Sequence, residues 1–551
     1  MKRHIAITTL CIALSAGAYA ASAVQDPTMI YGEALSGVSP DGQWVAGQIT
    51  DGSVIIRNLA TGEFWADFAS GLNNYYVGYG SPVSNIGVVA GSTTTSNAAY
   101  WEKGKWTLLP VPNRQYICNA VSITPDGSII CGGVGMAQVG ADTESTMLFP
   151  ALWYRQEDGT YGDPLILPHP ELDLTGRAPQ YISAIAVSDD GKTVAGEITD
   201  YFGARTEPIA YTCDANRNWT FRRLGTEMLN PNGIVFPEWP GGLDDDILMP
   251  TQEWYMTPEQ IEAFVEAFNE WDNTGEPPRY EDFMTPEQIA EYRAALKEYY
   301  DIVAPWAEKY NEFMEVYMRY LNQGSSFGRN QIRLSPDGKI CVTSSGGRPV
   351  VFNLETGETT VLQTQRPTAI TCVTADYSIL AYISAKGADL GTYKAYIYPQ
   401  MQEGGMALED YLKGVSPDLY EWMESHLYQD VIVGLNADGT LATETMMCTG
   451  IPVATPDMGI IVTNNSTASW IDDPGEEYLS LVLPTGLNNT ENNAVEEIVE
   501  NKDCEGMSVY DLAGTLVATG KTLDTDALAK GVYIVVKRYG DGTYSTSKIC
   551  L

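Results

Sequence analysis

Val38-Ser39-Pro40-Asp41-Gly42-Gln43-Trp44-Val45-Ala46-Gly47 carries the strongest structural signal in this 551-residue chain. The proline presets φ in a turn, the aspartate bonds nearby backbone N–H groups, and the glycine supplies a positive φ. An apolar run suited to a strand follows the turn. The segment therefore predicts a β-hairpin.

Looser copies of this segment recur along the chain. The copies span residues 38–47, 83–91, 125–132, 187–196, 334–341, 373–381 and 454–462. Their turn positions, taken as Gly42, Gly87, Gly127, Gly191, Gly338, Tyr377 and Gly459, are 45, 40, 64, 147, 39 and 82 residues apart. Three of these spacings match the roughly 40–50 residues of a four-stranded propeller blade, so the three long ones must contain insertions.

A compact copy, residues 333–364, has the turns and apolar runs of four short strands, which make one blade. A ring of blades buries both faces of each sheet and leaves only short edges. We therefore predict an all-β fold, a seven-bladed β-propeller over residues 24–484. Two stacked β-sandwiches are the alternative.

The repeated segment resembles the WD40-like and HAF-type extracellular repeats of bacterial β-propellers. The likeness covers residues 28–484 apart from the insertions, and includes a strand such as Ala98-Ala99-Tyr100-Trp101 after the hairpin. Copies two and six depart from the pattern, with Ile86 in place of Asp and Tyr377 in place of Gly. The resemblance implies an architecture and leaves the activity open.

The charge and the N-terminus indicate an exported protein. The chain has 32 Lys and Arg against 71 Asp and Glu, a net charge of −39, which disfavours nucleic acids and anionic membrane surfaces as partners. Residues 1–23 combine a basic start, a short apolar run and small-residue cleavage sites, so we predict a signal peptide and no transmembrane segment. The mature chain would carry −41.

Eight cysteines remain after residue 23, an even number that is compatible with disulfides in an exported protein. Cys131 and Cys341 align with the alanines of other copies, such as Ala46 and Ala195, so we interpret them as small buried side chains. The other six, whose pairing stays open, are Cys118, Cys213, Cys372, Cys448, Cys504 and Cys550.

The largest insertion, residues 243–321, is predicted to be helical and acidic. Met256 to Ile261 and Met284 to Ile289 both read Met-Thr-Pro-Glu-Gln-Ile, a helix start with a capping box and proline at N1. Aromatic residues follow the first start at helical spacing. We expect a break at Pro305, followed by a second aromatic stripe of Trp306, Tyr310, Phe313 and Tyr317. The insertion has 19 acids against 5 basic residues, a net −14. One interpretation is a cap over one mouth of the ring that binds a partner or ligand. The other is a helical excursion whose aromatic stripes pack on each other and whose acids face solvent, and both can hold together.

A second insertion, about residues 405–427, is also expected to be helical. It contains Gly414-Val415-Ser416-Pro417-Asp418, which repeats residues 37–41, but Leu419 replaces the turn glycine. We therefore expect Ser416 and Pro417 to begin a helix, and we count no eighth blade.

The C-terminal part is predicted to comprise a linker, residues 485–504, and a small β domain, residues 505–551. Val509-Tyr510-Asp511-Leu512-Ala513-Gly514, then Lys530 to Val535, and the final Lys-containing strand resemble the C-terminal sorting domain of the type IX secretion system of Bacteroidetes. The upstream Pro-Asn-Pro element of such domains is absent here. The resemblance implies a cell-surface or extracellular location and contact with the secretion machinery.

Few residues suggest chemistry. Residues 324–328 match Gly-x-Ser-x-Gly, but they follow a helix and lack the strand-turn-helix setting of a nucleophile elbow. His169 and His426 are far apart and make no metal motif, and Asp244-Asp245-Asp246 lacks an EF-hand pattern. We therefore assign no catalytic residue, cofactor or metal ion.

Two functions remain. The favoured one is a non-catalytic, exported binding or scaffold protein that presents loops and a helical cap to a protein or glycan. The alternative is a polysaccharide-active hydrolase or lyase with its site in the propeller funnel. Two or three carboxylates converging with an Arg or Tyr in the funnel would favour the enzyme.

Overall fold

The computed structural model describes residues 26–49, 53–67, 75–76, 81–93, 95–114, 116–137, 146–243, 247–272, 274–324, 326–364, 368–384, 393–435, 440–466, 478–487, 504–511, 516–520, 532–539 and 544–550. The predicted signal peptide and Asp244 to Asp246 lie outside these ranges. The chain divides into two compact units, one ending at Pro484 and the other beginning at Thr485.

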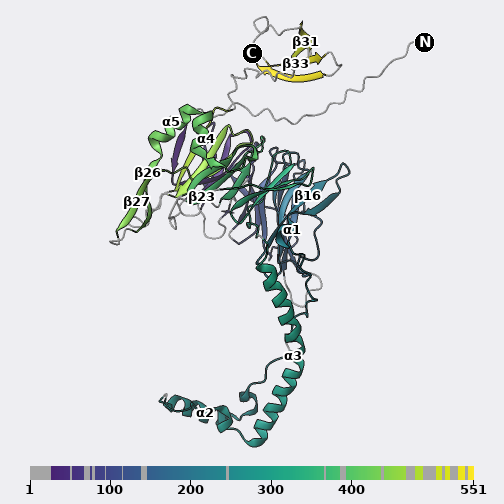
Figure 1. Ribbon diagram of the computed structural model, residues 1–551, viewed down its shortest axis with the longest axis vertical. Coiled ribbons are helices and arrows are strands. Elements are labelled where there is room, and N and C mark those ends of the chain that lie inside the picture. Colours follow the sequence, from purple (N-terminus) through teal and green to yellow (C-terminus); the bar gives the residue numbers. More distant parts are fainter. Residues whose placement is uncertain are drawn as a thin grey trace, which may run out of the picture. The chain divides into compact units, whose positions relative to one another are not determined.

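The first unit consists mainly of four-stranded antiparallel groups in chain order (Figure 1). The first two are β2 (Glu33–Val38), β3 (Trp44–Ile49), β4 (Val54–Asn58), β5 (Phe64–Asp67), and β6 (Tyr75–Tyr76), β7 (Val89–Thr93), β8 (Ala98–Glu102), β9 (Lys105–Leu108). The next two are β10 (Cys118–Ile123), β11 (Ile129–Ala137), β12 (Thr146–Tyr154), β13 (Leu165–Ile166), and β14 (Tyr181–Val187), β15 (Thr193–Thr199), β16 (Thr206–Cys213), β17 (Trp219–Arg223). A single parallel pairing, Leu148 with Tyr181, joins these two groups into one sheet.

The remaining groups of the first unit follow the long helices. They are β18 (Arg333–Leu334), β19 (Ile340–Ser345), β20 (Arg348–Asn353), β21 (Thr359–Val361), and β22 (Ala369–Val373), β23 (Ile379–Ser384), β24 (Tyr393–Tyr398), β25 (Met406–Ala407). The last is β28 (Ile451–Ala454), β29 (Ile460–Ser466), β30 (Tyr478–Pro484) with β1 (Thr28–Tyr31). One sheet is thus built from both ends of the unit.

Each copy of the repeated segment forms the turn between the first two strands of its group. In the first copy the Ser39 hydroxyl donates to Asp41 at 2.6 Å and accepts from the Trp44 N–H at 2.9 Å. Ser335 and Asp337 repeat this arrangement. The hydroxyl is buried in every copy, at Ser39, Ser84, Thr124, Ser188, Ser335, Thr374 and Thr455. The turn prediction from the sequence is therefore confirmed.

The seventh copy corrects the choice of turn residue. The positive φ lies at Met458 (φ 55°), whose N–H donates to the Thr455 carbonyl, whereas Gly459 was expected there. In the first copy the equivalent hydrogen bond is donated by the Gly42 N–H to the Ser39 carbonyl. The residue directly after the aspartate must enter the left-handed region to close this turn, and at this position that residue is Met458.

The ring closes through the chain ends of the first unit. Strand β1 pairs with β30, and the Leu35 N–H donates to Ser480 Oγ at 2.8 Å. Buried clusters join sheets that are neighbours along the chain, and one cluster joins the first sheet to the last through Val45 and Val482. A central cavity is lined by residues of every group, among them Val38, Ser81, Ile123, Ile185, Leu334, Val373 and Ala454. This is the arrangement of a β-propeller.

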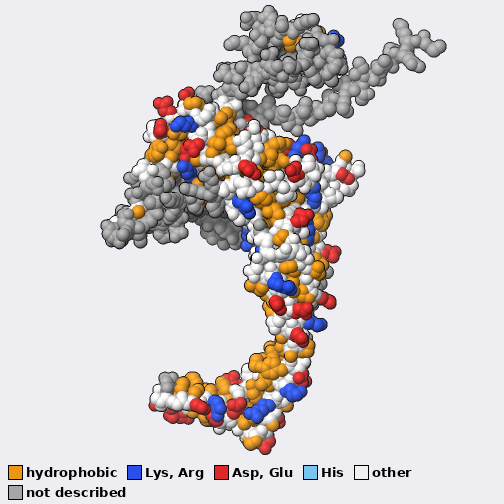
Figure 2. All heavy atoms as spheres, in the orientation of Figure 1, with side chains coloured by type: hydrophobic (Ala, Val, Ile, Leu, Met, Phe, Trp, Pro, Cys, Tyr) orange, Lys and Arg blue, Asp and Glu red, His pale blue; other side chains and the backbone are white. Residues whose placement is uncertain are grey.

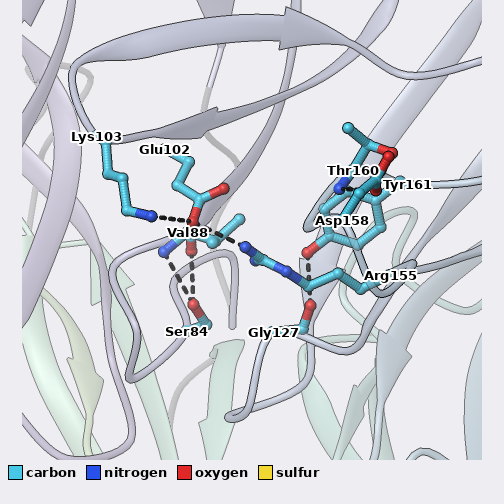
Figure 3. Close-up of polar contacts among 9 residues, drawn as sticks. All are labelled: Ser84, Val88, Glu102, Lys103, Gly127, Arg155, Asp158, Thr160 and Tyr161. Atoms are coloured by element: carbon cyan, nitrogen blue, oxygen red, sulfur yellow. Dashed lines mark hydrogen bonds and ion pairs between the residues drawn. The ribbon is translucent and has the colours of Figure 1, made fainter.

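Polar contacts act both between and within the sheets (Figure 3). Between the second and third sheets, Arg155, directly after β12, forms an ion pair with Glu102 of β8 at 2.8 Å. Within the third group, the Tyr161 hydroxyl donates to the Gly127 carbonyl at 2.6 Å. The ion pair is partly exposed, so it contributes modestly to the contact between the two sheets.

The described cysteines bear on the expected core positions and disulfides. Cys131 and Cys341 are fully buried, as expected of core side chains. The strand register corrects one detail, because Cys341 faces Leu334 as Val45 faces Val38. Cys341 therefore occupies a valine position and not the alanine position. Cys118, Cys213 and Cys372 also form no disulfide among the described residues, and the side chains of Cys504 and Cys550 lie outside the description.

Helices separate β17 from β18. They are α1 (Thr226–Leu229), η1 (Gln252–Tyr255), α2 (Pro258–Glu270), η2 (Tyr280–Asp282) and α3 (Pro286–Leu321). Both predicted capping boxes are present, at Thr257 with Gln260 and at Thr285 with Gln288. The two glutamine side chains also bond each other, at 3.0 and 2.9 Å, so the two helix starts lie side by side.

The helices correct two expectations. They project away from the sheets as an arm, and therefore do not cap a mouth of the ring (Figure 1). Helix α3 also continues through Pro305. A proline costs one backbone hydrogen bond, but the next residue, Trp306, is held by a bond from its Nε1 to the Gly241 carbonyl at 3.0 Å.

A short helix, η3 (Pro399–Met401), lies between β24 and β25. Between β25 and β28 lie α4 (Leu408–Val415), α5 (Pro417–His426), and the hairpin of β26 (Tyr428–Leu435) and β27 (Leu441–Met447). Pro417 is at N1 of α5 as expected, although the Ser416 side chain makes no capping bond. Sequence reasoning did not foresee the hairpin. No described helix combines the length and apolar character needed to cross a membrane.

The second unit contains one antiparallel sheet with the order β32-β31-β33-β34. Its strands are β31 (Cys504–Asp511), β32 (Leu516–Gly520), β33 (Val532–Tyr539) and β34 (Tyr544–Cys550).

Candidate functional site

The central cavity of the propeller is narrow. Its volume is about 50 Å³, enough for a few water molecules and too small for a sugar ring. The first strand of each group has a repeated turn at one end. At the opposite ends of these strands the central cavity opens into a pocket of about 390 Å³. This mouth pocket is lined by Ser92, Thr93, Ser96, Ile117, Cys118, Asn119, Ala120, Val121, Ile185, Asn330 and Arg333.

The mouth pocket is lined by both apolar and polar residues. Ile117, Val121 and Ile185 supply the apolar part, whereas Ser96 and Asn330 supply hydroxyl and amide groups. A small pocket with a few polar groups in its lining suits an uncharged, hydroxyl-bearing ligand.

Arg333 belongs to the framework of the pocket. It is buried, and its Nε donates to the Thr371 carbonyl at 2.6 Å while Nη1 donates to the carbonyls of Asn330 and Ile332 at 2.8 Å. These bonds tie the first strand of one sheet to that of the next. The guanidinium therefore positions the backbone around Asn330.

A buried carboxyl group lies next to Asn330. Glu197 of β15 is 1% exposed, and it accepts from the Asn330 N–H at 2.9 Å and from the Tyr181 hydroxyl at 3.4 Å. Asn330 has a positive φ of 58°, which asparagine tolerates better than most residues. The Arg329 guanidinium carbon lies 5.0 Å from the centre of the Tyr181 ring.

Burial raises the pKa of Glu197 to about 7, and the bond from Asn330 only partly offsets this effect. Burial also raises the pKa of Glu207 on β16 to about 7, although Arg223 lies 3.4 Å away. Glu197 pairs with Pro208, so Glu207 points to the opposite face of the sheet. The two carboxyl groups therefore do not form the shared acid pair of a glycoside hydrolase.

The base of the helical arm is a second polar and aromatic cluster. Phe313, Tyr317 and Tyr320 of α3 pack with Phe202 and Trp239. The Tyr317 hydroxyl donates to Asp200 at 3.0 Å. The aromatic stripe of α3 thus packs on the sheet-bearing part of the unit, and not on the stripe of α2 as the packing alternative supposed.

The distal arm has a different character. Phe264 stacks on Tyr280 at 3.9 Å, yet Val265 and Phe268 of α2 remain 47% and 48% exposed. Trp254 is 57% exposed. Apolar side chains also cover the middle of α3 on the face seen in Figure 2.

The candidates named from the sequence are scattered. Ser325 lies outside the described residues, and the rest of its motif follows α3 without a helix after it. The His169 ring packs on Phe149 at 4.7 Å, and burial lowers its pKa. His426 stacks on Trp422 at the end of α5. Among the described residues, no group of three or more His, Cys, Asp or Glu is placed to hold a metal ion.

Sequence reasoning missed Glu197 and Arg205. For Glu197 a signal existed, since a lone acid stands in the otherwise uncharged segment Thr193–Thr199. For Arg205 no sequence signal connects the residue with α3, more than a hundred positions later.

No family model and no curated protein matches the chain. Among solved structures it is similar to an oligogalacturonate lyase in complex with manganese, with 12% identity, a TM-score of 0.39, and coverage of 83% of this chain and 92% of that one. It is also similar to the β-propeller domain of Myceliophteria thermophila Cps50 (Swd1), with 8% identity, a TM-score of 0.32, and coverage of 63% and 79%. Likeness at this level carries no functional argument, and the propeller assignment rests on the sheets and their closure.

Proposed function

We propose that the protein is an exported, seven-bladed β-propeller that acts as a non-catalytic binding scaffold, with the helical arm as its main contact surface for a partner protein or glycan. The seven repeated turns, each at the start of a four-stranded group, support the blade number. The arm supports the binding role, because large apolar side chains of soluble proteins are seldom left on a projecting element without a partner.

Export is part of the proposal. Residues 1–23 have the pattern of a signal peptide, and the four strands between Cys504 and Cys550 are compatible with a sorting module that contacts a secretion machinery. We place the protein outside the cell or on its outer surface. Fractionation of the producing bacterium tests this location, and recovery of the full chain from the cytoplasm would contradict it.

The binding role is tested by crosslinking on whole cells. The full chain is compared with a variant in which residues 248–298 are replaced by a short Gly/Ser linker, leaving the α3 base intact. We expect a crosslinked partner with the full chain and its loss with the variant. Val265→Ser combined with Phe268→Ser should reproduce the loss, whereas Ser substitutions at the exposed propeller residues Phe64 and Leu165 serve as controls. An unchanged set of partners would contradict the role of the arm.

One observation favours a second function, a polysaccharide-active hydrolase or lyase. Glu197, with a pKa near neutrality, lies beside Tyr181 and Arg329 at the mouth of the propeller, and such groups suit proton transfer. A polysaccharide digestion screen decides between the two. Cleavage by the wild type that Glu197→Gln abolishes would establish the enzyme, and binding without cleavage on a glycan array would support the scaffold.

A further inference from the structure

Helix α3 has a shallow groove on one face, formed by residues at helical spacing. Tyr300, Val303, Ala304 and Ala307 make its apolar part, and Tyr300 is 52% exposed. Ala304 and Phe313 are nine residues apart, which at about 100° per residue places them on opposite sides of the helix. The groove therefore faces away from the aromatic base that attaches α3 to the propeller.

The charges along this face are arranged symmetrically about Ala304. Arg293 and Glu315 each lie eleven residues from Ala304, about three helical turns, on the N-terminal and C-terminal sides. Lys297 and Glu312 lie seven and eight residues from it, about two turns. Basic residues thus lie on the N-terminal side of the groove, whereas Glu308, Glu312 and Glu315 line its C-terminal half and small residues line its middle.

From this pattern we infer that α3 binds α3 of a second copy of the chain, antiparallel, with a two-fold axis at Ala304. A two-fold interface must be self-complementary, so that each residue meets its mate in the other copy. In this arrangement Arg293 lies opposite Glu315, and Lys297 lies opposite Asn311 and next to Glu312, twice each. Ala304 and Ala307 at the centre let the two helix backbones approach closely.

The net charge of the arm does not oppose this pairing. Residues 243–285 carry twelve acids and one base, whereas α3 carries seven acids and four bases. Of the net charge of −14 on the insertion, −11 therefore lies before α3 and only −3 on the helix. In the single chain Lys297 forms an ion pair with Asp301 of the same helix at 2.6 Å, but the Lys297 side chain is 77% exposed. An exposed pair of this kind is weak, and the lysine can exchange one carboxylate for another.

The inference rests on the arm being a contact surface, and it names a second copy as the partner. Sedimentation equilibrium of residues 24–551 tests it, with a dimer expected at micromolar concentrations. Ala304→Glu, which places two like charges on the axis, should weaken the dimer at least about tenfold. Lys309→Glu, a charge change on the other side of α3, is the matched control and should leave the dimer intact.

Two further tests, a charge exchange and a disulfide crosslink, guard against trivial loss of structure. Lys297→Glu and Glu312→Lys should each weaken the dimer, and their combination should restore it, because the paired charges are only exchanged. Ala304→Cys should form an interchain disulfide under mild oxidation, whereas Lys309→Cys should not.

A wild-type chain that stays monomeric, or a dimer unaffected by all of these changes, overturns the inference. These outcomes would not decide the proposed function. A different partner whose crosslinking depends on residues 248–298 would still support the binding role of the arm without self-association.

Discussion

The Nη2 atom of Arg205 donates a hydrogen bond to the main-chain carbonyl of Leu321, the last residue of α3, at 2.6 Å. The same atom lies 2.8 Å from the Gln323 carbonyl and 3.3 Å from that of Tyr320. A helix ends with carbonyl groups that have no partner within the helix, and its C-terminus carries partial negative charge. The loop between β15 and β16 thus supplies the cap that attaches the arm to the propeller.

Replacing Arg205 should loosen this attachment. For Arg205→Met we expect a loss of about 1–3 kcal/mol, since buried carbonyls lose a charged donor. Hydrogen exchange of the last turns of α3 should become faster while the sheets stay protected. Lys309→Met removes a cation elsewhere on α3 and serves as the control. Equal exchange in both variants would show that Arg205 does not hold the helix end.

Pro305 should limit the stability of the arm. An interior proline costs a helix roughly 3 kcal/mol, so Pro305→Ala should slow hydrogen exchange around residues 301–309. It should also change the direction of the distal arm, measurable by spin-label distances. Pro286→Ala provides the comparison, because proline at N1 costs the helix little. If Pro305→Ala and Pro286→Ala changed hydrogen exchange to a similar extent, Pro305 would not be what limits the stability of the arm.

Glu197 should make stability depend on pH. Its pKa is raised from 4.5 to about 7 in the folded chain, so between these values the native state holds a proton that the unfolded state has released. Stability therefore falls as pH rises through this window, by about 3 kcal/mol in all. Glu197→Gln should reduce the slope and stabilise the protein above pH 7, as urea unfolding at several pH values would measure. In this variant Glu207 should keep its own contribution to the pH dependence of stability. A slope of stability against pH equal to that of the wild type would contradict the raised pKa of Glu197.

Two glycines of equal φ should respond differently to alanine. Gly62 and Gly338 both have φ 73°, but a Cβ at Gly62 meets nothing within 4 Å, while at Gly338 it would lie 2.7 Å from Thr193 Oγ1. Gly62→Ala should cost about 1 kcal/mol from backbone strain. Gly338→Ala should cost about 2–3 kcal/mol, because the neighbouring sheet must also move. Thermal unfolding measures both, and equal losses would argue against tight packing between the turn and that sheet.

Much of the fold could be predicted because its signals are local. The buried hydroxyl of each repeated turn, and the aspartate in all copies but the second, bond backbone groups within five residues. The capping boxes at Thr257 and Thr285 close within three residues. Such contacts need no knowledge of the rest of the chain. The shift from Gly459 to Met458 was missed because spacing alone does not show which residue takes the positive φ.

The candidate site was less predictable, because it depends on residues distant in sequence. Glu197 meets Asn330 across 133 positions, and burial by another sheet raises its pKa. The direction of the arm follows from Arg205, Asp200 and Tyr317, and is encoded in no single segment.

The sequence by itself determined the repeated hairpins, the helix starts of the arm and the concentration of acids before α3, because turn chemistry, capping and charge act over a few residues. Tertiary structure decided how the ring closes, that the helices project as an arm, and which carboxyl groups lose contact with water. Packing brings together groups that the chain holds far apart, and burial then changes their charge and exposure.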